Sequence, residues 1–429
     1  MPHEVTTNTS APCEPVVSPC IRPLYAACAV YLLTYALIVV AVGICVHLLP
    51  DESDANRKTI VQRMSNFDGQ WYGRIAETGY TFSIEHYSSI VFFPAYPLVG
   101  RALSTVTGLR SVTSLVAVSA VCLALAFVVF AKYLAIKASS REDARRVALT
   151  LIALGVYPPA FFLRMGYTES TFLLLLLVAM YSMEKGWHPL VVAFVIGAAS
   201  ATRFMGILLL VPFAMYLWKL YRYQYSNMTS TRSRRVVLGM AVIQFSVLTF
   251  VSLWGLLGFM GYQLLAFNEP LAFIKGQAAW HQREPAPFIA CIRGLATLEP
   301  LWSTYISDSP LYWARIPPSH NALINLRFAN PIFFFMSIVA IVTGARRKWI
   351  NVRECTLAAL LIIVPYLLQA PRQGMISEAR FGAIAFPIYI VGGHLLAGLP
   401  RLATIIVLAM SCLLMVAYTM SFAGGYPLL

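Results

Sequence analysis

The chain has 429 residues, of which 59% are hydrophobic and only 12% carry a charge. Soluble globular domains carry about 25% charged residues, so this composition excludes an ordinary soluble protein and indicates a polytopic membrane protein. The formal net charge of +14 could suggest a nucleic-acid partner. The Lys and Arg residues stand in short runs between apolar segments, however, as in membrane proteins that keep positive charge in the cytoplasm. We therefore expect no nucleic acid.

The N-terminal segment, residues 1–20, is rich in Thr, Ser and Pro and is expected to be a disordered cytoplasmic tail. Residues 21–429 are expected to form one transmembrane domain. Its first apolar stretch, residues 21–50, is longer than the roughly 20 residues that cross a hydrocarbon core. This stretch is too long for a signal peptide and lacks a small-residue cleavage site, so we expect a retained first helix.

Further apolar stretches follow at short intervals, which predicts an all-α membrane protein with about eleven transmembrane helices. After the first, the stretches are residues 111–136, 147–163, 168–183, 189–201, 204–218, 236–267, 328–344, 356–370, 381–399 and 402–422. The chain has 8 Cys and no CxxC pair, so neither a zinc site nor a redox motif is indicated.

Residues 90–108 are a further apolar candidate, but Arg101 stands in their middle. A charge at bilayer depth costs roughly 2.5 to 3.5 kcal/mol on insertion scales. If this segment does not span, the basic clusters at residues 137–146, 219–235 and 346–353 all fall on the cytoplasmic side. We therefore expect an interfacial or re-entrant helix here.

This topology gives two long outer loops, residues 51–110 and 268–327. The first is expected to carry interfacial helices and the site, and the second to pack down as a cap. The topology also brings residues 164–170, Arg203 and residues 372–380 to the same face, opposite the basic clusters. Most of the unusual polar chemistry is therefore expected on the extracytoplasmic side.

Asp68 stands directly before a predicted amphipathic helix in the first outer loop. Trp71 and Tyr72 follow at i+3 and i+4, so they share a face with Asp68, and such aromatic side chains favour the headgroup region. A structural use is open, because Asp is a favoured helix N-cap. The alternative is a carboxylate that acts as a general base.

Three further charged positions carry similar alternatives. Glu169 lies at the start of a predicted helix, where a negative charge is favourable, and Arg164 could pair with it or bind a phosphate. Arg203 interrupts an otherwise apolar run between two short spans. Such a residue usually faces a cavity or a headgroup, although it could also snorkel from a helix end.

The later part of the chain adds five candidates. Gln277, Trp280 and His281 stand at i, i+3 and i+4 of a likely helix in the second outer loop, a pattern suited to hydrogen bonding and stacking on a sugar. Glu378 and Arg380 stand at the mouth of the tenth span, where they could pair with each other. Arg380 is otherwise a further candidate for phosphate binding, with Arg203 and Arg164.

Six motifs in order resemble those of the PIG-V-like mannosyltransferases, a family that includes GPI mannosyltransferase 2 and shorter bacterial relatives. They are FDGQWYGRIAETGY at 67–80, FFPAYPL at 92–98, YPPAFFLRMGYTESTFLLLL at 157–176, ATRFMGILLLVP at 201–212, FIKGQAAW at 273–280 and EARFGAIAFPIYI at 378–390. The resemblance covers most of the chain between residues 66 and 390. The sequence departs from the family pattern in having Phe67 where a Trp often precedes the Asp.

The resemblance implies a GT-C fold with its site facing the lumen or periplasm, a polyprenyl-phosphate sugar donor, and inversion at the anomeric carbon. In the family, the Asp of the first outer loop is the presumed catalytic base, which here is Asp68. We therefore expect Asp68 as the base and Arg203, Arg380 or Arg164 at the donor phosphate. Glu169 and Glu378 are expected, with the aromatic and amide residues above, to bind substrate.

The expected function is an inverting transfer of a sugar, most plausibly mannose, to a glycolipid or glycan hydroxyl, as in GPI-anchor biosynthesis. No cofactor or metal is expected, because a lipid monophosphate can leave without one. A bacterial cell membrane is favoured over the endoplasmic reticulum. A secondary transporter or lipid flippase remains the alternative, although no inverted repeat stands out, and a non-catalytic scaffold subunit is a third possibility.

Overall fold

The structure is a computed structural model that describes residues 21–48, 58–138, 141–226, 231–280, 287–314 and 321–426. The predicted tail, residues 1–20, lies outside them. The described part contains helices and no strand, so the predicted all-α class is confirmed. The α-helices are α1 (Ile21–Leu48), α2 (Ile60–Arg63), α3 (Asp68–Thr78), α4 (Ala95–Thr107), α5 (Ser111–Ala135), α6 (Arg141–Val156), α7 (Glu169–Glu184), α8 (Pro189–Thr202), α9 (Leu210–Ser226), α10 (Thr231–Ser252), α11 (Trp254–Phe267), α12 (Ala272–Lys275), α13 (Phe288–Ala296), α14 (Glu299–Trp302), α15 (Leu326–Arg346), α16 (Val352–Gln373), α17 (Glu378–Ile384), α18 (Pro387–Gly398) and α19 (Arg401–Ala423).

The predicted count of eleven membrane spans is not confirmed. In the described ranges, 6 helices are long and apolar enough to cross a membrane, or up to 9 if each of three bent pairs is one span. The other two predicted spans correspond to α7 and α8, which have only 16 and 14 residues. The protein is nevertheless an integral, multi-pass membrane protein by the number of its apolar helices.

Three stretches that the sequence presents as straight spans are bent. The α6 helix turns by 75° into the 3₁₀ helix η3 (Pro158–Arg164), and α17 turns by 79° into α18, which begins at Pro387. In both places a proline removes a backbone N–H donor, and Tyr157, which precedes Pro158, has the non-helical ψ of 128° that a following proline favours. The break between α10 and α11 bends the chain by 54°.

Helix α4 supports the predicted interfacial placement of residues 90–108. Its 13 residues extend about 20 Å at 1.5 Å per residue, which is too short for a hydrocarbon core of about 30 Å. The helix packs on α3 and α5, and Tyr96 donates a hydrogen bond to the carbonyl oxygen of Leu115 at 2.8 Å. Arg101 is exposed, so its charge is not buried in the protein.

Close packing between helices holds the bundle together. The pairs α5 with α7 and α6 with α18 make extensive contact, and the rings of Phe130 and Tyr133 pack edge-on against Phe386. At Gly393 of α18, an added Cβ would lie 2.0 Å from Thr150 Oγ1 of α6. Only glycine therefore allows these two helices to approach so closely.

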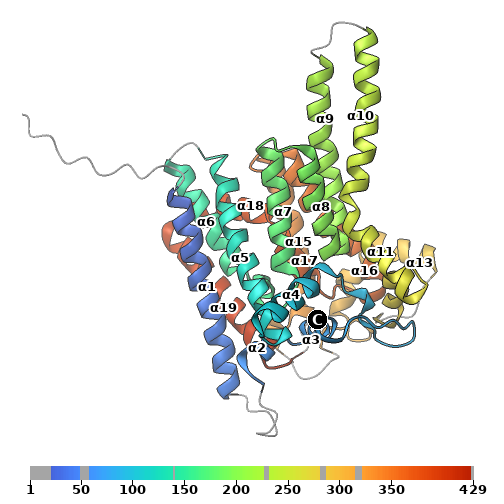
Figure 1. The fold of residues 1–429 in the computed structure, drawn as a ribbon. Helices are drawn as coiled ribbons and strands as arrows, with labels where there is room; N and C mark the ends of the chain where they lie inside the picture. Colours follow the sequence, from blue (N-terminus) through green and yellow to red (C-terminus); the bar gives the residue numbers. More distant parts are fainter. Residues whose placement is uncertain are drawn as a thin grey trace, which may run out of the picture.

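The helix bundle has two distinct ends (Figure 1). Helices α2, α3 and α4 gather at one end, and α9 and α10 extend beyond the bundle at the other. Helices α7 and α16 run between the ends in opposite directions, because Glu184 at the end of α7 pairs with Arg353 at the start of α16 at 2.9 Å. The first turn of α7 and the last turn of α16 therefore lie at the end that carries α3.

Candidate active site

Asp68 is the first residue of α3 and does not cap it. The N-cap is Phe67, and no side chain makes a capping hydrogen bond there. Phe67 has φ 57°, which is unusual for a residue with a bulky side chain. The turn is held by Asn66, whose side chain donates to the carbonyl oxygen of Phe422 at 3.0 Å and whose own carbonyl accepts from Tyr167 Oη at 3.0 Å.

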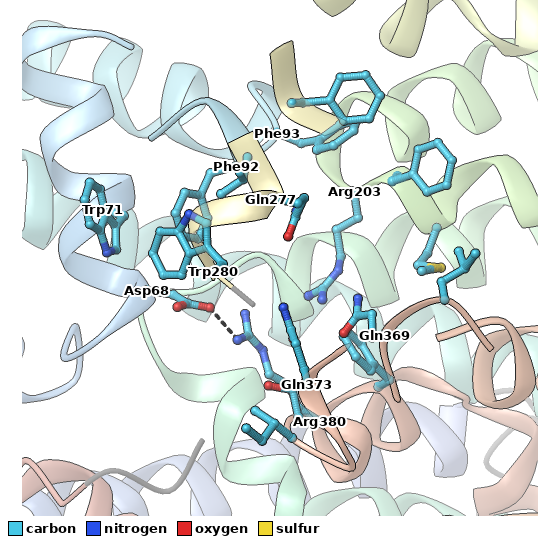
Figure 2. A pocket seen from close by; sticks show the side chains of 18 of the residues that line it. Asp68, Trp71, Phe92, Phe93, Arg203, Gln277, Trp280, Gln369, Gln373 and Arg380 are labelled. Carbon is cyan, nitrogen blue, oxygen red and sulfur yellow. Dashed lines mark hydrogen bonds and ion pairs between the residues drawn. The ribbon is translucent and has the colours of Figure 1, made fainter. Parts of the chain in front are cut away.

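Four charged side chains form a continuous chain of ion pairs, of which Figure 2 shows the pair between Asp68 and Arg380. Arg380 Nη1 donates to Asp68 Oδ2 at 2.5 Å, and Arg380 Nε donates to Glu169 Oε1. Arg203 Nη1 donates to the same Glu169 oxygen at 2.5 Å and to Thr168 Oγ1 at 3.2 Å. Two carboxylates and two guanidinium groups thus alternate, and their formal charges cancel.

Burial differs along this chain of ion pairs. The side chain of Glu169 is fully buried, that of Arg380 is 6% exposed, that of Arg203 14% and that of Asp68 22%. Glu169 is therefore the most deeply buried member of the network, and Asp68 is the most accessible one. Buried ions of this kind are stable only when they are paired, and removing one partner leaves an uncompensated charge.

Aromatic rings surround the guanidinium groups. The Arg380 guanidinium lies 4.5 Å from the ring centroid of Tyr167, and that of Arg203 lies 5.4 Å from the ring of Phe381. Such contacts stabilise a desolvated cation. Burial raises the pKa of Tyr72 to about 12 and that of Tyr167 well above its ordinary value, so both phenols stay protonated at physiological pH.

A cavity of about 700 Å³ lies against the exposed side of the network. One of its walls is aromatic: the Trp280 ring packs edge-on against Trp71 at 5.5 Å and Tyr87 at 4.7 Å between centroids, and Phe92 stacks on Trp71. Aromatic faces of this kind suit the apolar face of a sugar ring. The cavity thus combines a charged floor with a stacking wall (Figure 2).

Most of the predicted site residues line this cavity. They are Asp68, Trp71, Tyr72, Arg203, Gln277, Trp280 and Arg380. These residues come from α3, the α8–η4 junction, the 3₁₀ helix η5 (Gly276–Trp280) and α17. His281, the remaining member of the predicted sugar-binding triplet, lies outside the described residues.

Arg164 is not a cavity residue, contrary to the prediction. Its fully buried guanidinium donates to the carbonyl oxygens of Ala160 at 2.9 Å and Gly155 at 3.0 Å, and to Thr34 Oγ1 at 2.5 Å. Arg164 therefore ties α1, α6 and η3 together. It does not pair with Glu169, which instead bonds to two arginines from other helices.

The two predicted substrate-binding glutamates also lie off the cavity surface. Glu169 is beneath it and contacts the arginines. Glu378 is buried, and neither of its carboxylate oxygens has a hydrogen-bond partner in the described part of the chain. It does not pair with Arg380, because residues two apart on a helix do not face each other.

Three polar residues of the cavity were missed by the sequence analysis. Gln369, Arg372 and Gln373 lie on the last turn of α16 and line the cavity. Their spacing of i, i+3 and i+4 places them on one helix face. The available signal was this polar triplet at the end of an otherwise apolar span. The sequence analysis placed residues 372–380 on the site face but assigned no role to these three side chains.

Within the described ranges, no group of three or more His, Cys, Asp or Glu side chains lies close enough together to hold a metal ion. The two carboxylates of the site, Asp68 and Glu169, are each bonded to arginine. In this arrangement Asp68 can accept a proton, and the guanidinium groups of Arg203 and Arg380 can stabilise negative charge on a ligand.

Comparisons with known proteins indicate that the protein is a glycosyltransferase. A family model described as mannosyltransferase (PIG-V) matches residues 25–282, in agreement with the family that the sequence motifs resemble. A search of curated proteins finds no match.

Among solved structures, the chain is similar to an oligosaccharyltransferase of Archaeoglobus fulgidus. The apo form has 14% identity and a TM-score of 0.41, over 92% of this chain and 56% of that one. The oligosaccharyltransferase AglB in complex with an inhibitory peptide and a dolichol-phosphate has 16% identity and a TM-score of 0.42, over the same shares. The chain thus spans little more than half the length of these proteins, and no residue correspondence follows at such TM-scores.

Proposed function

The chain belongs to the PIG-V mannosyltransferase family, and we propose that it transfers mannose from a polyprenyl-phosphate donor to a hydroxyl group of a glycolipid or glycan. Membership makes the protein a glycosyltransferase, and its many apolar helices place it in a membrane with access to a lipid-linked donor. The donor lipid, the sugar and the mechanism below are our proposal.

The proposed reaction is a single displacement at the anomeric carbon. The acceptor hydroxyl oxygen forms a bond to that carbon while the bond to the phosphate oxygen breaks, and its electron pair leaves with the polyprenyl phosphate. The hydroxyl proton passes to Asp68. Because bond formation and bond breaking occur on opposite faces of the sugar, the configuration inverts. The step needs no cofactor, and the phosphate gains the negative charge that the carboxylate loses.

The observation that carries this proposal is the position of Asp68. Its Oδ2 is bound to Arg380 at 2.5 Å, whereas its Oδ1 accepts no hydrogen bond from the described residues. One oxygen thus orients the carboxylate and the other is available for a proton. A general base in such a position contributes typically about 10² to 10⁴-fold in rate.

Arg380 and Arg203 support the second half of the reaction. Both line the cavity, and their shared acceptor Glu169 holds them at a fixed spacing. Preorganised positive charge at the leaving group lowers the barrier most when it does not have to reorient during the reaction. In the proposal the sugar stacks on Trp71 and Trp280, between Asp68 and the arginines.

The extracytoplasmic face is the proposed side of reaction. The basic residues Lys137 and Arg353 lie at the end of the bundle opposite Asp68, each in an ion pair at that end. Since positive loops stay in the cytoplasm, Asp68 would face the lumen or periplasm. A donor carried by a membrane lipid is available there without a nucleotide.

The decisive test compares Asp68→Asn with Glu77→Gln in the full-length protein in proteoliposomes. Glu77 is an exposed carboxylate on the same helix that does not line the cavity, so it is a matched control. With radiolabelled polyprenyl-phosphate mannose and an acceptor glycolipid pool, we expect Asp68→Asn to lose about 10² to 10⁴-fold in transfer rate per folded molecule. Glu77→Gln should retain the wild-type rate.

Two outcomes would contradict the proposal. Full activity of Asp68→Asn would remove this residue from the role of base. Uptake of labelled lipid across the bilayer without any glycosylated product would instead favour the transporter or flippase.

A further inference from the structure

We propose that Gln369, Arg372 and Gln373 form a phosphate-binding subsite that selects lipid-phosphate substrates, with the donor as its first ligand. The inference rests on the proposed function, because it assigns the phosphate of that reaction to a place in the cavity. It differs from the sequence-based expectation, which assigned the phosphate to Arg203, Arg380 and Arg164 alone.

The first step of the argument is a charge count over the cavity wall. Four charged side chains line it: Asp68, Arg203, Arg372 and Arg380. Arg203 and Arg380 are each ion-paired to carboxylates, and together with Asp68 and Glu169 they are formally neutral. The net positive charge of the described wall therefore comes from Arg372.

The second step concerns unused hydrogen-bonding capacity. Among the described residues, the side chain of Arg372 makes no ion pair or hydrogen bond, and neither do the side-chain amides of Gln369 and Gln373. A guanidinium offers five N–H donors in a planar fork, and each amide adds two more. Phosphate oxygens are the acceptors that such a fork binds best.

The third step is geometric. All three side chains line the cavity from a single helical turn, and Figure 2 shows Gln369 and Gln373 reaching toward the same space as Arg203 and Arg380. Helix α16 ends at Gln373, and its C-cap Gly374 has a φ of 66° that turns the chain toward α17. This turn brings the last turn of α16 and Arg380 to the same cavity.

The charge also matches the ligand. A polyprenyl-phosphate sugar is a phosphodiester with one negative charge, which the single unpaired guanidinium can balance. The monoester that leaves carries a second charge at neutral pH. Arg203 and Arg380 lie on the same cavity and can stabilise that additional charge, so binding and leaving-group stabilisation fall to different arginines.

A purely structural explanation of Arg372 is also available, because a positive charge in the last turn of a helix interacts favourably with the helix dipole and stabilises the helix. That explanation predicts a loss of thermal stability on substitution and no change in ligand affinity. The subsite predicts the opposite, so the two explanations can be separated in one experiment.

The test measures binding to the full-length protein in nanodiscs with two probes: a short-chain polyprenyl monophosphate for the donor and glycerophosphoinositol for a phosphate on the acceptor. Arg372→Gln is compared with Arg293→Gln, which removes an exposed charge from α13 without touching the cavity. We expect Arg372→Gln to raise the Kd of polyprenyl monophosphate at least tenfold, and Arg293→Gln to change it less than twofold. Arg372→Lys, which keeps the charge but loses the fork, should fall between them.

Each outcome has a defined meaning. Weaker binding of polyprenyl monophosphate supports the subsite and assigns it to the donor, and weaker binding of glycerophosphoinositol supports it and assigns it to the acceptor. Unchanged affinity for both probes overturns the proposal. If the wild type binds polyprenyl phosphate through Arg372 but forms no glycosylated product, the proposed function fails while the subsite stands. If it forms product and Arg372→Gln has wild-type affinity and KM, the subsite fails alone.

Discussion

Helix α7 begins and ends in an ionic cluster, and the two clusters differ in a way that separates chemistry from architecture. Its first residue, Glu169, belongs to the site cluster with Asp68, Arg203 and Arg380. Its last residue, Glu184, belongs to a far cluster at the opposite end of the bundle. The far cluster comprises Tyr133, Lys137, Glu184, Asn351, Arg353 and Glu354.

The buried carboxylate of the far cluster, Glu354, is saturated, whereas Arg353 Nη1 is buried without a partner among the described residues. Glu354 is fully buried, and its Oε1 accepts from Lys137 and from Tyr133 Oη at 2.7 Å. Its Oε2 accepts from the backbone N–H of Asn351 at 2.7 Å in a capping box that starts α16. Both oxygens of this carboxylate are thus used: Oε1 joins α16 to the end of α5, and Oε2 caps α16 itself.

The site cluster is not saturated. Glu169 Oε2 is buried without a partner in the described part of the chain, and the network faces a cavity of about 700 Å³. Phe67 and Ser377, which both line that cavity, have positive φ angles of 57° and 67°. Incomplete pairing and backbone strain beside a cavity are typical of a site that is organised for a ligand, not of one that only stabilises the fold.

Among substitutions that test the difference between the two clusters, Glu169→Gln is expected to have the largest effect on stability and on transfer rate. The substitution leaves two buried guanidinium groups without their shared charge, so we expect a loss of about 3 to 5 kcal/mol in the free energy of unfolding. The arginines should also shift, and a displacement of about 1 Å can cost about 10²-fold in rate. Thermal unfolding and transfer rate per folded molecule would measure both. A wild-type rate in the folded fraction would contradict a positioning role for Glu169.

A smaller effect, confined to stability, is expected for Glu354→Gln in the far cluster. Weakening the hydrogen bonds from Lys137 and Tyr133 should cost about 2 to 3 kcal/mol, because bonds to a charged acceptor are worth more than neutral ones. Transfer by the folded fraction should keep its KM and kcat. A tenfold fall in kcat without a loss of stability would show that the two ends do not differ as proposed.

The smallest effect is expected for Glu378→Gln, which lies in neither cluster. Its oxygens have no partner among the described residues, so an amide of the same shape loses no hydrogen bond and removes a charge that is costly to bury. Thermal stability should stay unchanged or rise, and the transfer rate should remain within about twofold of wild type. A tenfold loss of rate would return Glu378 to the list of substrate contacts.

The part of the site that the sequence predicted depends on short-range spacing. Asp68, Trp71 and Tyr72 lie within one turn of α3, and Gln277 and Trp280 within η5, so helical periodicity alone places each set on one face. The prediction that α4 is interfacial rested on one charge, Arg101, and on the basic loops. These predictions needed no knowledge of how distant segments meet.

The rest depends on contacts between segments far apart in the chain. Asp68 and Arg380 are 312 positions apart, and no local pattern indicates that they bind each other. Conversely, Arg164 and Glu169 are near in sequence, but Arg164 belongs to the bent η3 segment and bonds to Thr34 of α1. Prolines mark the breaks in two of the spans, whereas no local pattern gives the bend angles of 75° and 79°.

The short length of α7 has a consequence for which acceptors can react. Its 16 residues reach about 24 Å, less than a hydrocarbon core of about 30 Å, and ion pairs hold both of its ends. We therefore predict that the reaction centre, which lies at one of these ends, is deeper than the headgroups of the surrounding lipid. Such a depth would admit a hydroxyl on a narrow, lipid-tethered sugar and exclude the surface of a folded protein.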